Sequence, residues 1–168
     1  PNIVLNKLYK FTQLQSSFSV NSIALVKGRP KLLNLKELIS NFVEHRHDVV
    51  VRRSNYELKK AEERAHILKG LIVASDNIDR VIELIRSSEN TESAKKSLQD
   101  QFELTEIQAK AIVEMRLRQL TGLEQEKLRD EFEELNKTIE RLKNILSNKD
   151  LRMDIIKDEL TVVKDKYG

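Results

Sequence analysis

Two stripes of apolar residues, each repeating in steps of three and four, constrain this chain more than any other feature. Such a repeat places apolar side chains along one seam of an α-helix and is typical of coiled coils. The second stripe is unbroken, whereas the first has one polar gap, at Ser54. The predicted seam consists of Val51, Leu58, Ala61, Ala65, Leu68 and Ile72 in the first stripe and Leu128, Phe132, Leu135, Ile139, Leu142 and Leu146 in the second.

The two stripes predict two helices of similar length, over residues 48–75 and 124–147. At about 1.5 Å per residue the helices would be about 42 and about 36 Å long, so they can lie side by side. The first stripe is rich in alanine and the second in Leu, Ile and Phe, so the two surfaces complement each other in size. Because about fifty residues separate the helices, we expect an antiparallel pair with the intervening segment at its tip.

The intervening residues, 76–122, predict a small helical knob. Apolar residues recur at helical spacing over residues 77–87, more weakly over 92–102, and again from residue 105 onward. Thr105 and Gln108 match a capping box, in which each side chain binds the other residue's backbone amide. The third helix is therefore expected to run from Thr105 through Met115 to Thr121, with Gly122 as its stop signal.

The N-terminal residues predict a short helix within 2–15 and then a β-hairpin. Residues 22–26 and 31–33 are the expected strands, and the sequence Lys-Gly-Arg-Pro at 27–30 is the turn signal. A helix is expected from residue 35, with Asn34 as its N-cap. The sequence His-Arg-His-Asp at 45–48 predicts a bend before the first arm helix, and residues 150–167 predict a last helix.

We therefore predict a mainly α fold, in which a long antiparallel coiled-coil arm is capped by a small helical dimerisation knob. A short β-hairpin lies near the N-terminus. The expected segments are 1–34 (helix and hairpin), 35–75 (connecting helix and first arm helix), 76–122 (knob), 123–149 (second arm helix) and 150–168 (C-terminal helix).

Composition excludes several classes of protein. The chain has no cysteine, which excludes a disulfide framework, thiolate metal sites and a cysteine nucleophile. It has no apolar run of 18 residues, so no membrane span is expected. The chain starts with Pro1 and not with Met, which predicts a piece of a longer protein, and it shows no basic and apolar leader, so no signal peptide is expected.

The net charge of +3 is unevenly distributed along the chain. Residues 1–50 carry seven Lys and Arg against three Asp and Glu, whereas residues 51–168 carry 23 against 24. A basic first third would suit contact with nucleic acid. A solvated surface with chance asymmetry is the alternative, and an excess of four charges does not decide between them.

The polar residues do not assemble into a predicted active site. His45 and His47 are two residues apart and would point to different faces of a helix, and His66 lies beside the seam. The four glycines are isolated, so no phosphate-binding loop or dinucleotide fingerprint is present. We therefore predict no catalytic, cofactor-binding or metal-binding residue, and a scaffold or interaction role.

Several short motifs in the sequence resemble those of the A subunits of bacterial type IIA DNA topoisomerases, which are DNA gyrase and topoisomerase IV. The resemblance covers nearly the whole chain in order. It is carried by residues 6–10, 12–15, 42–46, 49–53, 56–58, 64–68, 77–79 and 84–86, and it is firmest at Gln-Ala-Lys-Ala-Ile (108–112), Met-Arg-Leu (115–117) and Leu-Thr-Gly-Leu (120–123).

The resemblance implies an ATP-dependent type II topoisomerase, an isomerase that breaks, passes and rejoins double-stranded DNA. In that family a catalytic tyrosine follows an arginine, whereas Tyr9, Tyr56 and Tyr167 follow Leu, Asn and Lys. The fragment itself is therefore expected to be non-catalytic and without a cofactor. The parent complex would use ATP and Mg²⁺ through its partner subunit, and residues 1–34 would be the end of the tower region near the DNA.

The resemblance also implies partners and a place in the cell. The expected partners are a second copy of the chain, bound through the knob at the exit gate (C-gate), a B-type ATPase subunit in an A2B2 complex, and double-stranded DNA. No membrane contact is expected, and the expected location is the bacterial cytoplasm. The candidate dimer interface comprises Thr105, Ile107, Gln108, Ala111, Ile112, Met115, Arg118, Leu120, Thr121 and Leu123. Gyrase is weakly favoured over topoisomerase IV. A generic coiled-coil adaptor and a DNA-binding scaffold module are the alternative functions.

Overall fold

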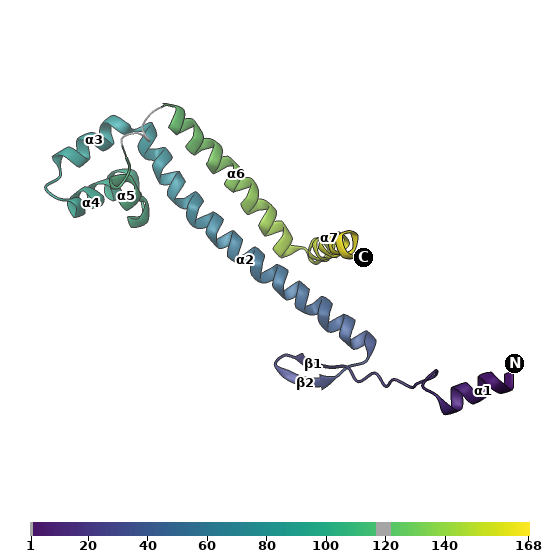
Figure 1. The fold of residues 1–168 in the computed structure, drawn as a ribbon. Helices are drawn as coiled ribbons and strands as arrows, with labels where there is room; N and C mark the ends of the chain where they lie inside the picture. Colours follow the sequence, from purple (N-terminus) through teal and green to yellow (C-terminus); the bar gives the residue numbers. More distant parts are fainter. Residues whose placement is uncertain (1, 117–121) are drawn as a thin grey trace. The chain divides into compact units, whose positions relative to one another are not determined.

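A computed structural model describes residues 2–116 and 122–168, which form seven helices and one two-stranded antiparallel sheet (Figure 1). This mainly helical architecture with an N-terminal hairpin confirms the predicted fold class. The chain divides into two compact units, Pro1–Arg46 and His47–Gly168. The division falls inside the segment 35–75 that the sequence predicts as one piece.

The first unit begins with helix α1 (Asn2–Phe11) and continues with strands β1 (Ile23–Val26) and β2 (Arg29–Leu32). The strands pair in antiparallel register, and Lys27 and Gly28 between them have φ values of 52° and 78°. Positive φ at both central positions is the geometry of a tight hairpin turn, which glycine adopts without steric cost. The predicted hairpin is confirmed.

Helix α1 is held by little more than its own backbone. None of its ten residues, all of which the structure describes, is buried. An isolated helix of this length is marginally stable in water. We expect backbone amides of α1 to exchange with solvent about 10³-fold faster than those of residues 61–74, as measured by hydrogen–deuterium exchange. Equal protection of the two segments would contradict this prediction.

Helix α2 (Leu35–Asp76) begins at a capping box. The Glu37 amide donates to Asn34 Oδ1 at 2.9 Å, and the Asn34 amide donates to Glu37 Oε2 at 3.1 Å, so the predicted N-cap is confirmed. The hydrogen bond from Asn34, followed by Lys31, lowers the pKa of Glu37. The carboxylate form of Glu37 makes these bonds. The cap is therefore fully formed at a pH above the ordinary pKa of a glutamate, and it weakens as the pH falls through the lowered pKa of Glu37.

The predicted bend at residues 45–48 is wrong, because α2 is one continuous α-helix through this stretch. Sharp breaks in helices are caused by proline, by glycine or by an inserted group. No proline or glycine occurs between Leu35 and Lys69. Two histidines and an aspartate have only weak preferences against a helix, and these do not interrupt it.

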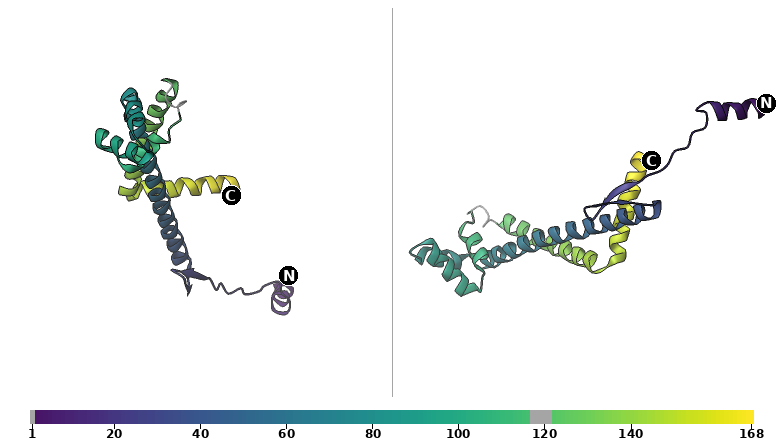
Figure 2. Two further views of the ribbon diagram at one scale, coloured as in Figure 1. Left: turned by 90° about the vertical axis from the view of Figure 1, so that its left-hand side faces the viewer. Right: turned by 90° about the horizontal axis from the view of Figure 1, so that it is seen from below.

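In the second unit α2 lies beside α6 (Gly122–Ser147), which runs in the opposite direction (Figures 1 and 2). Charged side chains link the two helices. Arg64 donates to Glu131 through Nε and Nη2, at 2.7 and 2.9 Å, and Lys143 Nζ lies 2.9 Å from Glu62. Exposed pairs of this kind contribute about 0–1 kcal/mol each, so most of the stability of the pair comes from its apolar seam.

Three short helices, α3 (Ile78–Ser87), α4 (Thr91–Phe102) and α5 (Glu106–Val113), form a knob at the end of α2. The buried core of the knob is continuous with α2, because residues of α2 and of the three knob helices form one cluster. The cluster consists of Leu68, Leu71, Ala74, Val81, Leu98, Ala109 and Ile112, and Leu128, Phe132 and Leu135 of α6 pack against it.

Two helix boundaries near the knob differ from the prediction. Helix α5 ends at Val113 instead of continuing through Met115, and the Met115 amide donates to the Ile112 carbonyl in a tighter final turn. The side chain of Met115 packs against the core cluster, which favours leaving the helix there. Helix α6 begins at Gly122, two residues before the predicted start at residue 124. The predicted role of Gly122 as a helix stop concerns residues 117–121, which lie outside the described residues.

Helix α7 (Lys149–Tyr167) follows α6 after Asn148, whose side chain accepts the Asp150 amide at 2.9 Å. Arg152 reaches back to the end of α6, where its Nη1 donates to the Ile145 carbonyl at 2.8 Å. Its Nε donates to His47 Nε2 on α2 at 2.9 Å. The positive charge of Arg152 suits the negative end of the α6 dipole, and its side chain fastens the corner between α6 and α7 to α2.

Candidate functional site

The described residues offer surfaces for contact more than sites for chemistry. No group of three or more His, Asp or Glu suitable for a metal ion occurs among residues 2–116 and 122–168. Over the same residues, no helix combines the length and the apolar character needed to cross a membrane. The features to consider are therefore the seam of the arm and the surface of the knob.

The structure places half of the first predicted stripe inside the seam. Ala61, Ala65 and Leu68 are buried, whereas Val51, Leu58 and Ile72 are only partly buried. At the two ends of the stripe the adjacent residues are buried instead, Val50 beside Val51 and Leu71 beside Ile72. The predicted polar gap, Ser54, is also buried.

The reason for this shift is that α6 is not the only neighbour of α2. Near residues 47–53 the contacts to α2 come from α7, through Arg152 on His47 and Glu159 on Arg53. Near residues 68–74 they also come from the knob helices. A heptad pattern assumes one partner along the whole seam, so it misplaces positions where a second partner covers an adjacent flank.

On α6, only Leu142 of the predicted stripe is fully buried. The other five positions are partly buried, because a two-helix arm covers each seam from one side only. These positions are Leu128, Phe132, Leu135, Ile139 and Leu146.

The N-terminal end of α5 is attached to α2 by a network of hydrogen bonds. The side chain of Gln108 is buried, its Nε2 donates to the His66 carbonyl at 2.7 Å, and its Oε1 accepts the Thr105 amide at 3.0 Å. His66 Nε2 lies 2.8 Å from Thr105 Oγ1. Gly70 makes this approach possible, because a Cβ there would lie 2.7 Å from Gln108 Cβ. The capping box at Thr105 is confirmed, and the same two residues also attach the knob to the arm.

The candidate interface residues divide into an outer and an inner group. Ile107 and Leu123 are 61% and 66% exposed, far more than an apolar core residue. Gln108 and Ile112 are buried within the chain, and Ala111 and Met115 are partly buried against the core. Thr105 is exposed but bonded to His66. The remaining candidates, Arg118, Leu120 and Thr121, lie outside the described residues.

The sequence did not single out α3 as part of this surface. An apolar groove runs between α3 and the end of α5, on the same knob as Ile107. It is lined by Ile78, Val81, Ile82, Ile85, Arg86, Ile112, Val113 and Met115. The signal was present in the sequence, as a repeat of isoleucines on one face of residues 78–85, but that repeat does not say whether the face is covered.

Ion pairs of the knob lie on α3, between Arg80 and Glu83 at 2.8 Å, and on α4. Glu92 and Lys95 form an ion pair at 2.8 Å, in which the hydrogen bond lowers the pKa of Glu92 and raises that of Lys95. Both groups keep their charges at neutral pH, and the pair stabilises the first turn of α4. The groove lining is apolar except for Arg86, and Ile107 is an exposed apolar side chain, which suits a contact with another largely apolar surface.

Comparison with known proteins gives a consistent result. The family of DNA gyrase/topoisomerase IV A subunits matches residues 1–161. The A subunit of DNA gyrase from Staphylococcus epidermidis (strain ATCC 12228 / FDA PCI 1200) is 52% identical over 167 residues, and that from Staphylococcus aureus (strain Mu50 / ATCC 700699) is 51% identical. Each match covers 99% of this chain but only 19% of the relative.

Proposed function

This chain belongs to the family of DNA gyrase/topoisomerase IV A subunits, and we propose that it is the arm and the exit-gate dimerisation knob of such a protein. The observation that carries the proposal is the exposed apolar surface at the end of the arm. Ile107 of α5 and Leu123 in the first turn of α6 are both exposed, and the knob also carries an apolar groove. Exposed apolar side chains together with an apolar groove are typical of a protein contact.

The parent protein would be an ATP-dependent type II DNA topoisomerase of the bacterial cytoplasm. Its B-type partner in an A2B2 complex would supply ATP and Mg²⁺ chemistry, and double-stranded DNA would be the substrate. The chain itself would not be catalytic, because Tyr9, Tyr56 and Tyr167 lack the preceding arginine that marks the nucleophile. The chain would act mechanically, as a stiff lever ending in a reversible two-fold contact.

The proposed contact involves the outer group, Ile107 and Leu123, with Ala111 and Met115 at its edge. Arg118, Leu120 and Thr121 stay candidates from the sequence, outside the described residues. Gln108 and Ile112 would support it from beneath, because they are buried in the single chain. An exit gate has to open once per passage of DNA, so a small contact of mixed polarity suits it better than a fused core.

The test is sedimentation equilibrium over a concentration series. We expect the 19.6-kDa chain to form a reversible dimer. Ile107→Asp should raise the dimer dissociation constant at least about tenfold, since it places a charge at the centre of an apolar contact. Val162→Asp on α7 is the matched control, because Val162 is 65% exposed and far from the knob in sequence. A strict monomer, or equal effects of the two substitutions, would overturn the proposal.

A further inference from the structure

We propose that the outward face of α2 between Arg52 and Lys60 binds the phosphate backbone of duplex DNA. The surface consists of Arg52, Tyr56, Lys59 and Lys60, and all four residues are exposed. They lie within the second unit, away from the knob in sequence. The inference adds a DNA contact to the proposed function but does not depend on dimerisation.

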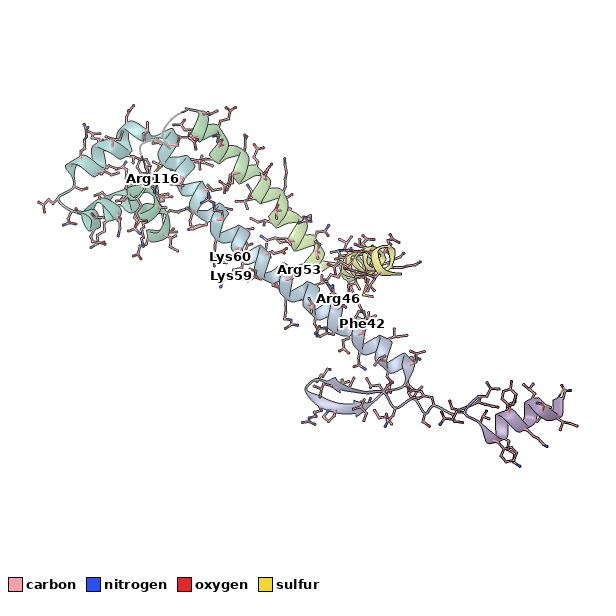
Figure 3. The ribbon with its side chains drawn as sticks, viewed as in Figure 1. Phe42, Arg46, Arg53, Lys59, Lys60 and Arg116 are labelled. Carbon is pink, nitrogen blue, oxygen red and sulfur yellow. The ribbon has the colours of Figure 1, made fainter. Side chains whose placement is uncertain are left out.

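Helix geometry places these four residues together. At 100° per residue they fall within an arc of about 100°, and Arg52 and Lys59 are two turns, about 10.5 Å, apart. The seam residues Ser54, Ala61 and Ala65 are buried on the opposite side of α2. Figure 3 shows Lys59 and Lys60 on the side of α2 that faces away from α6.

Positive charge is in excess on this face. Lys59 and Lys60 share one carboxylate, Glu63, at 4.0 and 3.8 Å, which are long distances for an ion pair. Arg52 donates its Nε to the Asp48 carbonyl at 3.4 Å, a neutral acceptor, and among the described residues none forms an ion pair with it. Three cations therefore have a single partner anion between them.

The rest of the arm shows a different pattern. Arg64, one turn further along α2, is bound by both oxygens of Glu131, and Lys143 pairs with Glu62 across the seam. These cations are neutralised within the chain, because they link α2 to α6. Arg53 likewise pairs with Glu159 of α7, whereas Arg52, Lys59 and Lys60 link no helices. Their charge is therefore available to an external anion.

The geometry favours an extended polyanion over a small one. The cations are spread over two turns of an exposed convex helix, which offers no enclosure for a single phosphate. Duplex DNA presents phosphates continuously along such a length, and it binds Lys and Arg through release of counterions. Tyr56 is 64% exposed between the cations, with Lys60 Nζ 5.9 Å from the centre of its ring. Its hydroxyl can donate to a phosphate oxygen.

The experiment measures binding of the chain to a labelled duplex of about 30 base pairs by fluorescence anisotropy, at several salt concentrations. The triple variant R52Q/K59Q/K60Q removes the three charges without reversing them. We expect the dissociation constant at low salt to rise at least about tenfold. The slope of log K against log salt should fall by about 2.7, which corresponds to three phosphate contacts.

The matched control is K157Q/K164Q/K166Q, which removes three exposed lysines of α7. It should change both the affinity and the slope much less. Circular dichroism of both variants verifies that the helices remain. Equal effects of the two triple variants would overturn the proposal. Binding of poly-glutamate as tightly as DNA would also overturn it, in favour of an acidic protein partner.

Sedimentation equilibrium of the R52Q/K59Q/K60Q variant separates this inference from the proposed function. The variant should dimerise like the unmodified chain, because no substituted residue lies on the knob. If DNA binding is unaffected by the three substitutions while the chain dimerises, the DNA contact fails and the exit-gate proposal stands. If the unmodified chain is monomeric but the triple variant loses DNA binding, the exit-gate proposal fails and the DNA contact stands.

Discussion

Replacing Leu68 with alanine is expected to lower the free energy of unfolding of the second unit by about 2–5 kcal/mol. Leu68 is 0% exposed and belongs to the cluster in which α2 meets α3, α4 and α5. Truncation removes buried methyl groups and leaves a cavity that the surrounding helices can fill only partly. Urea denaturation followed by circular dichroism measures the change through the midpoint at constant slope.

Leu160→Ala on α7 is the control for this substitution, because it has the same chemistry at a residue that is 40% exposed. Its effect should be clearly smaller, since part of that side chain remains in water in the folded protein. If Leu68→Ala cost no more than Leu160→Ala, the knob and the arm would not share the core described above.

Replacing Gly70 with alanine is expected to destabilise the protein by about 1–3 kcal/mol, although alanine is the better helix former by about 1 kcal/mol. A Cβ at this position would lie 2.7 Å from both Cβ and Cγ of Gln108. Gln108 cannot easily move away, because its amide group is bonded to His66 on α2 and to Thr105 at the start of α5. Thermal unfolding measures the effect.

Gly122→Ala provides the matched control, since nothing lies within 4 Å of a Cβ at Gly122. It should be neutral or slightly stabilising. The double variant G70A/Q108A should recover part of the stability lost in G70A, because the colliding side chain is shortened. An increase in stability for G70A alone would show that α5 does not pack closely on α2.

These two positions also bear on the proposed gate. Leu68 and Gly70 both hold the knob against the end of α2, whereas Ile107 lies on the exposed surface of the knob. A knob that moved freely on the arm would not transmit a force from the arm to the dimer contact. We therefore expect both substitutions to weaken dimers indirectly, at temperatures where the second unit remains folded.

Local signals in the sequence determined most of the secondary structure. The capping residues Asn34 and Thr105 mark helix starts through hydrogen bonds to residues three positions away. The hairpin turn follows from the Lys-Gly-Arg-Pro signal at 27–30, in which Gly28 adopts a positive φ without steric cost. The apolar stripes predicted two long helices packed against each other, since helical periodicity is itself a local property.

Only the tertiary structure decided which of the apolar and polar residues are covered. Gln108 is buried and Ile107 is exposed, although the polarity of the two side chains suggests the reverse. Helix α5 ends at Val113 and Met115 beyond it packs on the core, and α7 contacts α2 where the heptad pattern assumes α6. These outcomes depend on contacts between residues far apart in the chain, and periodicity along one helix carries no information about them.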